Sequence, residues 1–170
     1  MYLEFLFVIG DYFKTINKKI VLYEWGLPLI FSIICIFFKD SFKLELFGEI
    51  KEVSISILGV LLGFSIAVIT IITTGNGKNL EEIKKVLTKV KIGKNNISLY
   101  DLILINFSYT VVIEVIFILS CVLFPILDKI VIFSHTLKVY LYSMMIFIII
   151  HVLLLTLRNI TDFYLIITKK

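Results

Sequence analysis

Four long apolar stretches, separated by polar segments, dominate the pattern of this sequence. Residues 53–74 form the longest of them without a charge, and these 22 residues, at about 1.5 Å each, are long enough to cross the hydrocarbon core of a bilayer as one helix. Residues 20–38, 99–124 and 139–157 are three more stretches of spanning length. The pattern predicts an all-α membrane protein, with four transmembrane helices in a bundle that forms one domain over residues 1–170.

The polar segments predict shorter elements. Residues 1–19 begin with only about nine apolar positions before Asp11, too few to span, so they predict a helix that lies in the membrane interface. Residues 39–52 carry charges of both signs and predict a connector. Pro125 is expected to end the third span, and the polar tail from Arg158 is too short to cross again.

The loop of residues 75–98 predicts one further helix. Asn79, three residues ahead of Glu82, resembles a capping box at a helix start. The expected helix is amphipathic and about three turns long. Ser98 and Asp101 suit the N-cap and the positive end of the next helix dipole. The apolar face of the loop helix is expected from Leu80, Ile83, Leu87 and Val90.

Lysine and arginine are distributed unevenly around the spans. Twelve of the 17 basic residues lie in the N-terminal segment, the loop of residues 75–98 and the tail, which predicts that both termini and this loop are cytoplasmic in a bacterial inner membrane. The loop contains lysines without interleaved aromatic residues or arginines. It therefore favours anionic lipid headgroups or a cytosolic protein partner over nucleic acid. Its lysines are Lys78, Lys84, Lys85, Lys89, Lys91 and Lys94.

Composition supports the membrane class and argues against a metal or cofactor site. Apolar residues make up 59% of the chain, and the mean hydropathy is +1.04. Such a chain has the bilayer as its expected solvent. The two cysteines, Cys35 and Cys121, lie apart in apolar runs without the spacing of a metal site. We expect inert thiols and no cofactor.

Small side chains recur every three or four residues along the second span. They fall on one side of a helix, and in lipid such a strip is where two helix backbones approach closely. The pattern predicts a packing seam, either within the protein or between copies in a homo-oligomer. Its members are Ser56, Gly59, Gly63, Ala67, Thr70 and Thr74.

A polar stripe runs along the third span. Asn106, Thr110 and Glu114 are spaced by four residues, and Cys121 follows seven later. A carboxylate at mid-bilayer costs roughly 2.5–3.5 kcal/mol to insert, so Glu114 is expected to face the bundle interior, a wet cavity or a partner. His151 in the fourth span lies at a similar depth. The interpretation we favour is a hydrogen bond between Glu114 and His151 that locks the two helices together, with a proton relay or pore as the alternative.

Glu24 stands near the start of the first span, beside Trp25. It resembles the essential carboxylate in the first helix of small multidrug transporters, which have four spans and act as dimers. That resemblance implies proton-coupled transport of small cations. Those transporters have short loops, however, whereas this chain has a long basic loop. The ordinary interpretation is an interfacial carboxylate that extends to water.

Motifs for enzymatic chemistry are sparse. Gly63-Phe64-Ser65 is similar to the Gly-x-Ser of rhomboid proteases, with His151 as a conceivable base. Four spans and no further match argue against an enzyme. There is also no His-Glu-x-x-His motif and no glycine-rich phosphate loop.

The architecture as a whole resembles small four-helix bacterial membrane proteins, including the compact membrane components of anti-phage defence systems. This resemblance implies a homo-oligomeric channel or a membrane-permeabilising effector, whose path Ser, Thr, Asn and Glu side chains of the second and third spans would line. One alternative is an anchoring or sensor subunit that recruits a cytosolic partner through residues 75–98. Another is a small proton-coupled cation transporter that uses Glu114 or Glu24.

Overall fold

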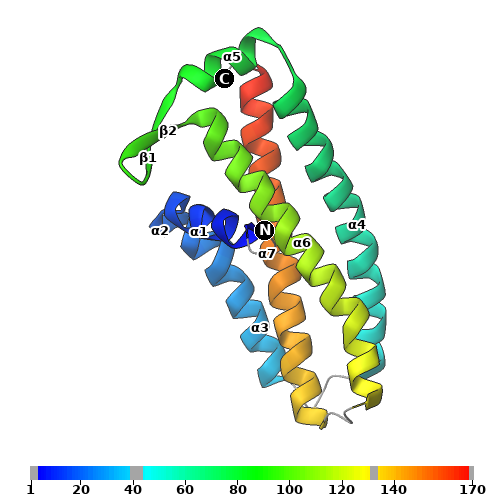
Figure 1. The fold of residues 1–170 in the computed structure, drawn as a ribbon. Coiled ribbons are helices and arrows are strands. Elements are labelled where there is room, and N and C mark those ends of the chain that lie inside the picture. Colours follow the sequence, from blue (N-terminus) through cyan, green and yellow to red (C-terminus); the bar gives the residue numbers. More distant parts are fainter. Residues whose placement is uncertain (1–3, 39–43, 131–133, 169–170) are drawn as a thin grey trace.

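Four membrane-spanning helices stand side by side in the computed structural model, which describes residues 4–38, 44–130 and 134–168 (Figure 1). The described part confirms an all-α bundle with four spans, and the chain is therefore a multi-pass integral membrane protein. The backbone alone is described for residues 44–47, 128, 130, 166 and 167.

The spans form a row rather than a square. Helix α3 packs against α7, α7 against α6, and α6 against α4, which also reaches α7. Neighbouring helices in this row run in opposite directions (Figure 1). The long spans are α4 (Leu44–Thr74), α6 (Leu99–Ile130) and α7 (His135–Thr168), whereas the first span combines α2 (Lys18–Val21), the π-helix η1 (Leu22–Gly26) and α3 (Leu27–Phe37).

The three long helices extend beyond the apolar stretches predicted from the sequence. Pro125 lies inside α6 and does not end it, so that prediction was wrong. A proline in a spanning helix is tolerated when neighbouring groups compensate for its missing N–H. Residues 44–52 continue α4, and the tail continues α7 to Thr168. The remainder of the predicted connector, residues 39–43, lies outside the described residues.

The helices differ in length relative to the hydrocarbon core of a bilayer. The first span has 20 residues, or about 30 Å, and matches the hydrocarbon core. Helices α4, α6 and α7 have 31, 32 and 34 residues, so at about 1.5 Å each they are roughly 15–20 Å longer than that core. At the end where α5 lies, α4, α6 and α7 reach further than the first span does (Figure 1).

A small folded cap covers that end. It consists of α5 (Lys78–Lys85), the antiparallel hairpin β1 (Leu87–Ile92) and β2 (Asn95–Ser98), and the adjoining ends of the long helices. Buried apolar side chains from α4, α5 and α6 form its core, and Phe163 of α7 packs against them. The buried members are Val68, Ile72, Ile83, Ile103 and Phe107.

The helix predicted in the loop is shorter than expected. It begins after Gly77 rather than at an Asn79 cap, and it ends at Lys85, after about two turns. Thr88, Val90 and Ile92 alternate with exposed residues, which is the period of a strand rather than a helix. Gly93 turns the hairpin at a φ of 67°, a conformation that glycine adopts without strain. The three-turn amphipathic helix was therefore wrong beyond Lys85.

The start of α6 confirms the predicted cap. The Asp101 backbone N–H donates to Ser98 Oγ at 3.1 Å, and Asp101 Oδ2 accepts from the Ser98 backbone N–H at 3.2 Å and from the Ser98 hydroxyl at 2.6 Å. This reciprocal pair satisfies backbone donors that the first turn of a helix leaves free.

Helix α1 (Phe5–Thr15) lies across the bundle and does not enter the row (Figure 1). It packs against α6 and β1. One side of it is buried at Tyr12 and Thr15, whereas Phe5, Leu6 and Phe7 are exposed. A short helix with an exposed apolar face beside the start of a span fits the predicted position in the membrane interface.

Candidate functional site

Glu24 lies at the centre of a buried polar network, and only 2% of its surface is exposed. Arg158 Nη1 of α7 lies 2.8 Å from Glu24 Oε1, and the Tyr12 hydroxyl of α1 donates to Glu24 Oε2 at 2.7 Å. The interpretation of Glu24 as a carboxylate that extends to water was therefore wrong. A buried carboxylate needs a cation and hydrogen bonds, and both come from elements distant in sequence.

The backbone carbonyl of Glu24 makes a second contact with α7, through His151. Pro28, four residues later, has no N–H to bond to the carbonyl of Glu24. His151 Nδ1 lies 2.8 Å from that carbonyl oxygen. Because a carbonyl only accepts, Nδ1 carries the proton, and His151 Nε2 is left to accept from the Tyr109 hydroxyl at 3.2 Å. Glu24, which lies in the π-helix, therefore contacts α7 through both its side chain and its carbonyl.

Tyr12 joins this network to α6. Its ring stacks on that of Tyr109, with centroids 3.6 Å apart. Burial, together with the hydrogen bond to Glu24, raises the pKa of Tyr12 above its usual range. The phenol therefore stays protonated and remains a donor to the carboxylate. We call this set, Tyr12, Glu24, Tyr109, His151 and Arg158, the Glu24 network.

Glu114 is not bonded to His151, so the predicted lock between α6 and α7 was wrong. Both nitrogens of His151 are already bound within the Glu24 network. Glu114 is fully buried and lies near the Ser65 hydroxyl of α4. Among the described residues, neither its carboxyl oxygens nor Ser65 Oγ has a hydrogen-bond partner of good geometry. The rhomboid-like pairing of Ser65 with His151 is likewise not formed.

The rest of the predicted stripe also faces inward. Asn106, Thr110 and Cys121 are buried, and Asn159 Nδ2 of α7 donates to Thr110 Oγ1 at 2.8 Å. The Oδ1 atoms of Asn106 and Asn159 have no partner within the described part of the chain. From Asn106 to Glu114 the stripe extends about 12 Å along the helix. We call Ser65, Asn106, Thr110, Glu114 and Asn159 the polar track.

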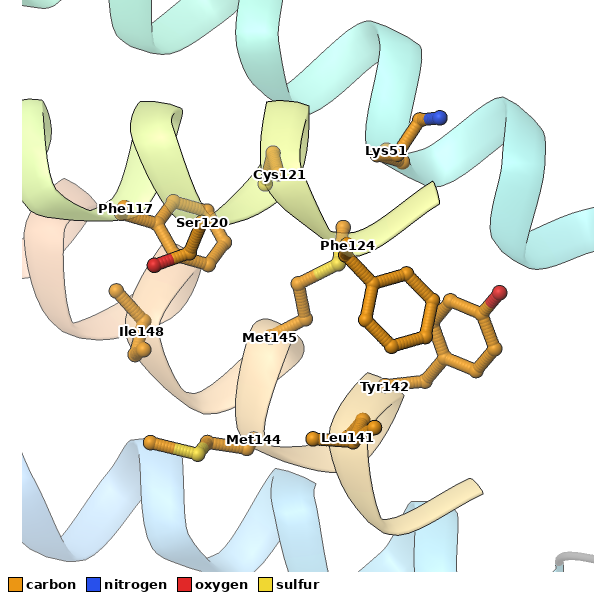
Figure 2. Close-up of a pocket in the computed structure, with 10 residues that line it drawn as sticks. All are labelled: Lys51, Phe117, Ser120, Cys121, Phe124, Leu141, Tyr142, Met144, Met145 and Ile148. Atoms are coloured by element: carbon orange, nitrogen blue, oxygen red, sulfur yellow. The ribbon is translucent and has the colours of Figure 1, made fainter. Parts of the chain in front are cut away.

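A pocket of about 200 Å³ opens at the far end of the bundle from the cap (Figure 2). Phe117 in its wall comes three residues after Glu114 on α6, so the pocket begins within one helical turn of the polar track. Its lining is almost entirely apolar, with Lys51 of α4 as the charged residue at the rim. The other lining side chains come from α6 and α7.

A second pocket, of about 350 Å³, lies on the cap side of the Glu24 network. Lys19 and Arg158 line it together with Glu24 and Asp162, so its formal charges balance. His, Cys, Asp and Glu side chains form no group of three that would hold a metal ion among the described residues.

The small-residue strip of α4 points away from the protomer. Gly59 and Gly63 have open space where a side chain would begin, and the other four members are exposed as well. The buried face of α4 is instead Ser54, Leu58, Ser65 and Val68. The prediction of a packing seam within the protomer was therefore wrong, and a seam between copies stays a prediction. The hydroxyls of Ser56, Thr70 and Thr74 donate to carbonyls of their own helix.

The six lysines of the loop are all exposed on the cap. Lys84 pairs with Glu81 at 2.8 Å and lies over the ring of Tyr100. Lys89 and Lys91 alternate with the inward side chains of β1 and so share one outward face.

Sequence reasoning missed Tyr12, Tyr109, Arg158 and Asn159. Tyr12 and Arg158 lie in segments classed as interfacial or tail, and Tyr109 and Asn159 carry no motif. No family model, curated protein or solved structure matches this chain.

Proposed function

We propose that this protein conducts protons through each protomer, with Glu114 as the group that takes up and releases the proton. The observation that carries the proposal is a fully buried carboxyl group that lies beside the Ser65 hydroxyl and, among the described residues, has no hydrogen bond of good geometry and no cation paired with it. An ionisable side chain in a membrane span is costly, and one so weakly bound by its surroundings is best explained by function.

The surroundings of Glu114 supply a path. On one side, Phe117 separates it from the pocket that opens at the far end of the bundle. On the other side, Thr110, Asn159 and Asn106 continue the polar track toward the cap. The apolar core of the cap, which includes Phe107 and Ile103, closes that end. Proton movement requires Phe117 and the cap core to yield in turn, as in alternating access.

Protons fit the track better than a bound metal cation does. A metal cation needs several oxygen ligands gathered around one point. Here the oxygens are spread over about 12 Å of helix, from Asn106 to Glu114. Such a row suits a chain of hydrogen bonds with one ionisable member.

This path differs from a pore along the axis of an oligomer. The polar side chains of α6 face α4 and α7 and would not reach a shared axis. The hydroxyls of the α4 strip bond to their own helix. We propose instead that copies of the chain pack through the strip at Gly59 and Gly63 and that each copy conducts separately.

Proteoliposomes with a pH-sensitive dye inside test the proposal. Wild-type protein is expected to dissipate an imposed pH gradient, and Glu114→Gln is expected to abolish this while reconstitution and oligomeric state stay equal. Glu81→Gln, which removes an exposed carboxylate from the cap, is the matched control and should conduct normally. Equal flux through wild type and Glu114→Gln, or no flux through wild type above empty vesicles, contradicts the proposal. A cation-sensitive dye in parallel distinguishes protons from other cations.

A second candidate function is recruitment of a cytosolic protein partner. The observation in its favour is that α5 and the hairpin form a packed cap that presents six lysines. An acidic partner would recognise that surface. Replacing Lys89, Lys91 and Lys94 by glutamine would abolish such binding, measured by co-purification from the native host, and would leave proton flux intact.

The orientation follows from charge. We propose that the cap and both termini face the cytoplasm of a bacterial cell, because most lysines gather there. Dissipation of the proton gradient would also suit an effector of anti-phage defence. A labelling reagent that cannot cross the membrane should reach a cysteine placed at position 129 and not one placed at position 85 in intact cells.

A further inference from the structure

The pocket at the far end of the bundle combines apolar walls with a single cation. Its volume of about 200 Å³ exceeds the roughly 150 Å³ of an apolar cavity that takes up benzene. Met144, Met145 and Leu141 contribute flexible apolar surface, and methionine adapts to ligands of irregular shape. Met144 and Ser120 are exposed, so a ligand can enter from the surrounding bilayer.

The charge of Lys51 has no ion-pair partner in the described part of the fold. It lies on α4 two residues before the charge-free stretch of residues 53–74, and so stands at the edge of the apolar zone. A lysine ammonium at this depth favours an anionic partner.

The two features lie at opposite sides of one pocket. Figure 2 shows Lys51 on α4 at one edge of the pocket, with its ammonium directed outward, and the side chains of Leu141, Met144 and Ile148 on the opposite side. A ligand that satisfies both sides has an anionic head and an apolar tail. A purely apolar ligand leaves Lys51 without a counter-ion among the described residues, and a cation is repelled by it.

We propose that this pocket binds the acyl chain of an anionic amphiphile, with Lys51 as the counter-ion of its head group. The chemistry has two sources, a free fatty acid and an anionic phospholipid of the leaflet at that end. The tail would lie against Phe117, Met145 and Ile148. The site rests on the pocket and on Lys51 and does not depend on proton conduction by Glu114.

Photolabelling of the purified full-length protein tests this site. A fatty acid and a phosphatidylglycerol, each with a diazirine in the acyl chain, are added in a neutral detergent, and the labelled residues are located by mass spectrometry. Labels are expected on α6 and α7 between Phe117 and Ile148. The methyl ester of the fatty acid and the matching phosphatidylcholine are expected to label at least tenfold less. Whichever anionic probe labels at the lower concentration identifies the source.

Two variants separate the charge from the cavity. Lys51→Gln should lower labelling by either anionic probe about tenfold and leave the weak labelling by the neutral probes unchanged. Ser120→Phe, at an exposed position in the pocket wall, should block all probes by filling the space. Lys129→Gln removes an exposed lysine at the same end of the bundle, outside the pocket, and should have no effect. Equal labelling by anionic and neutral probes, or labelling unchanged in Lys51→Gln, overturns the proposal.

Discussion

The ring of Tyr12 lies flat on the ring of Tyr109, with the two planes only 1° apart. Tyr12 belongs to a short helix that would otherwise lie loosely on the bilayer surface, whereas Tyr109 is in the middle of the row of spans. The stack and the hydrogen bond to Glu24 together fix α1 to the bundle. The N-terminal helix is therefore an integral part of the fold.

Substitutions at Tyr12 should separate these two contacts. Tyr12→Phe keeps the stacked ring but removes the donor to Glu24, and a hydrogen bond to a charged group contributes about 1.5–3 kcal/mol. Tyr12→Ala removes both and should cost about 3–5 kcal/mol. Unfolding in mixed detergent micelles measures the difference. Phe13→Ala, on the more exposed side of α1, is the control, and equal losses at the two positions would contradict this account.

Alkaline pH should weaken the same contact. Burial raises the pKa of Tyr12 in the folded protein, whereas the unfolded chain ionises near its usual value of about 10. The proton is therefore held more tightly in the folded state, and this part of the stability is present below about pH 10 and is lost as the pH rises further. The free energy of unfolding of wild type should fall more steeply than that of Tyr12→Phe above that pH. Parallel curves would show that Tyr12 ionises freely in the folded state.

The buried ion pair predicts strong coupling between Glu24 and Arg158. Removing one partner leaves an uncompensated charge, and such changes cost about 3–5 kcal/mol. Glu24→Gln and Arg158→Met should each destabilise the protein by about that amount. The double variant should cost less than the sum of the two, because no unpaired charge remains. A double-mutant cycle on unfolding free energies gives the coupling, and additive losses would exclude it.

Pro28→Ala should offset part of the stability lost in His151→Leu. In His151→Leu the carbonyl of Glu24 loses its donor, and an unsatisfied buried group costs about 1–3 kcal/mol. Pro28→Ala restores an N–H four residues after that carbonyl. The double variant should therefore recover part of the stability lost in His151→Leu. Proline to alanine elsewhere, at Pro125, serves as the control and should give no recovery.

Gly63→Leu should affect assembly without affecting the protomer. A Cβ atom at this position would have no atom of the described chain within 4 Å, and the position is exposed, so a leucine side chain can point away from the protomer. Between copies, however, it would keep two helix backbones apart. The oligomer should dissociate in size-exclusion chromatography while the thermal unfolding of the protomer is unchanged. Val60→Leu, on an exposed position of the same helix, should be silent, and equal behaviour of the two variants would remove the strip from the contact.

The spans were predictable because apolar length is a strong and local property. Their ends were not, since helices that pack on one another beyond the bilayer continue through polar residues such as those after Arg158. The hairpin was not predicted because Leu87 and Val90 fit the period of a helix as well as that of a strand. The alternation of inward and outward side chains from Thr88 to Ile92, which identifies a strand, is evident only from the burial in the structure.

For the buried polar side chains, the sequence predicted which ones face inward but not which ones bond to each other. The inward position of Glu114 and Thr110 followed from their spacing on one helix. The partners did not, because pairing depends on rotation between helices and not on depth alone. His151 lies at a depth similar to that of Glu114, yet it faces the other side of the row, where Glu24 offers a carbonyl without a donor. Sequence carries no direct record of that rotation.

The order of the row also determines when the protein can be completed during synthesis. The first span is translated first, and its packing partner α7 is translated last. Bonds between the two join residues 111 and 127 positions apart. Until Arg158 leaves the ribosome, the nascent chain holds Glu24 in the membrane without its counter-ion. Chains that stop short of α7 therefore lack both the counter-ion of the Glu24 carboxylate and the donor to its carbonyl, so we expect the first span to insert less stably in them than in the full-length chain.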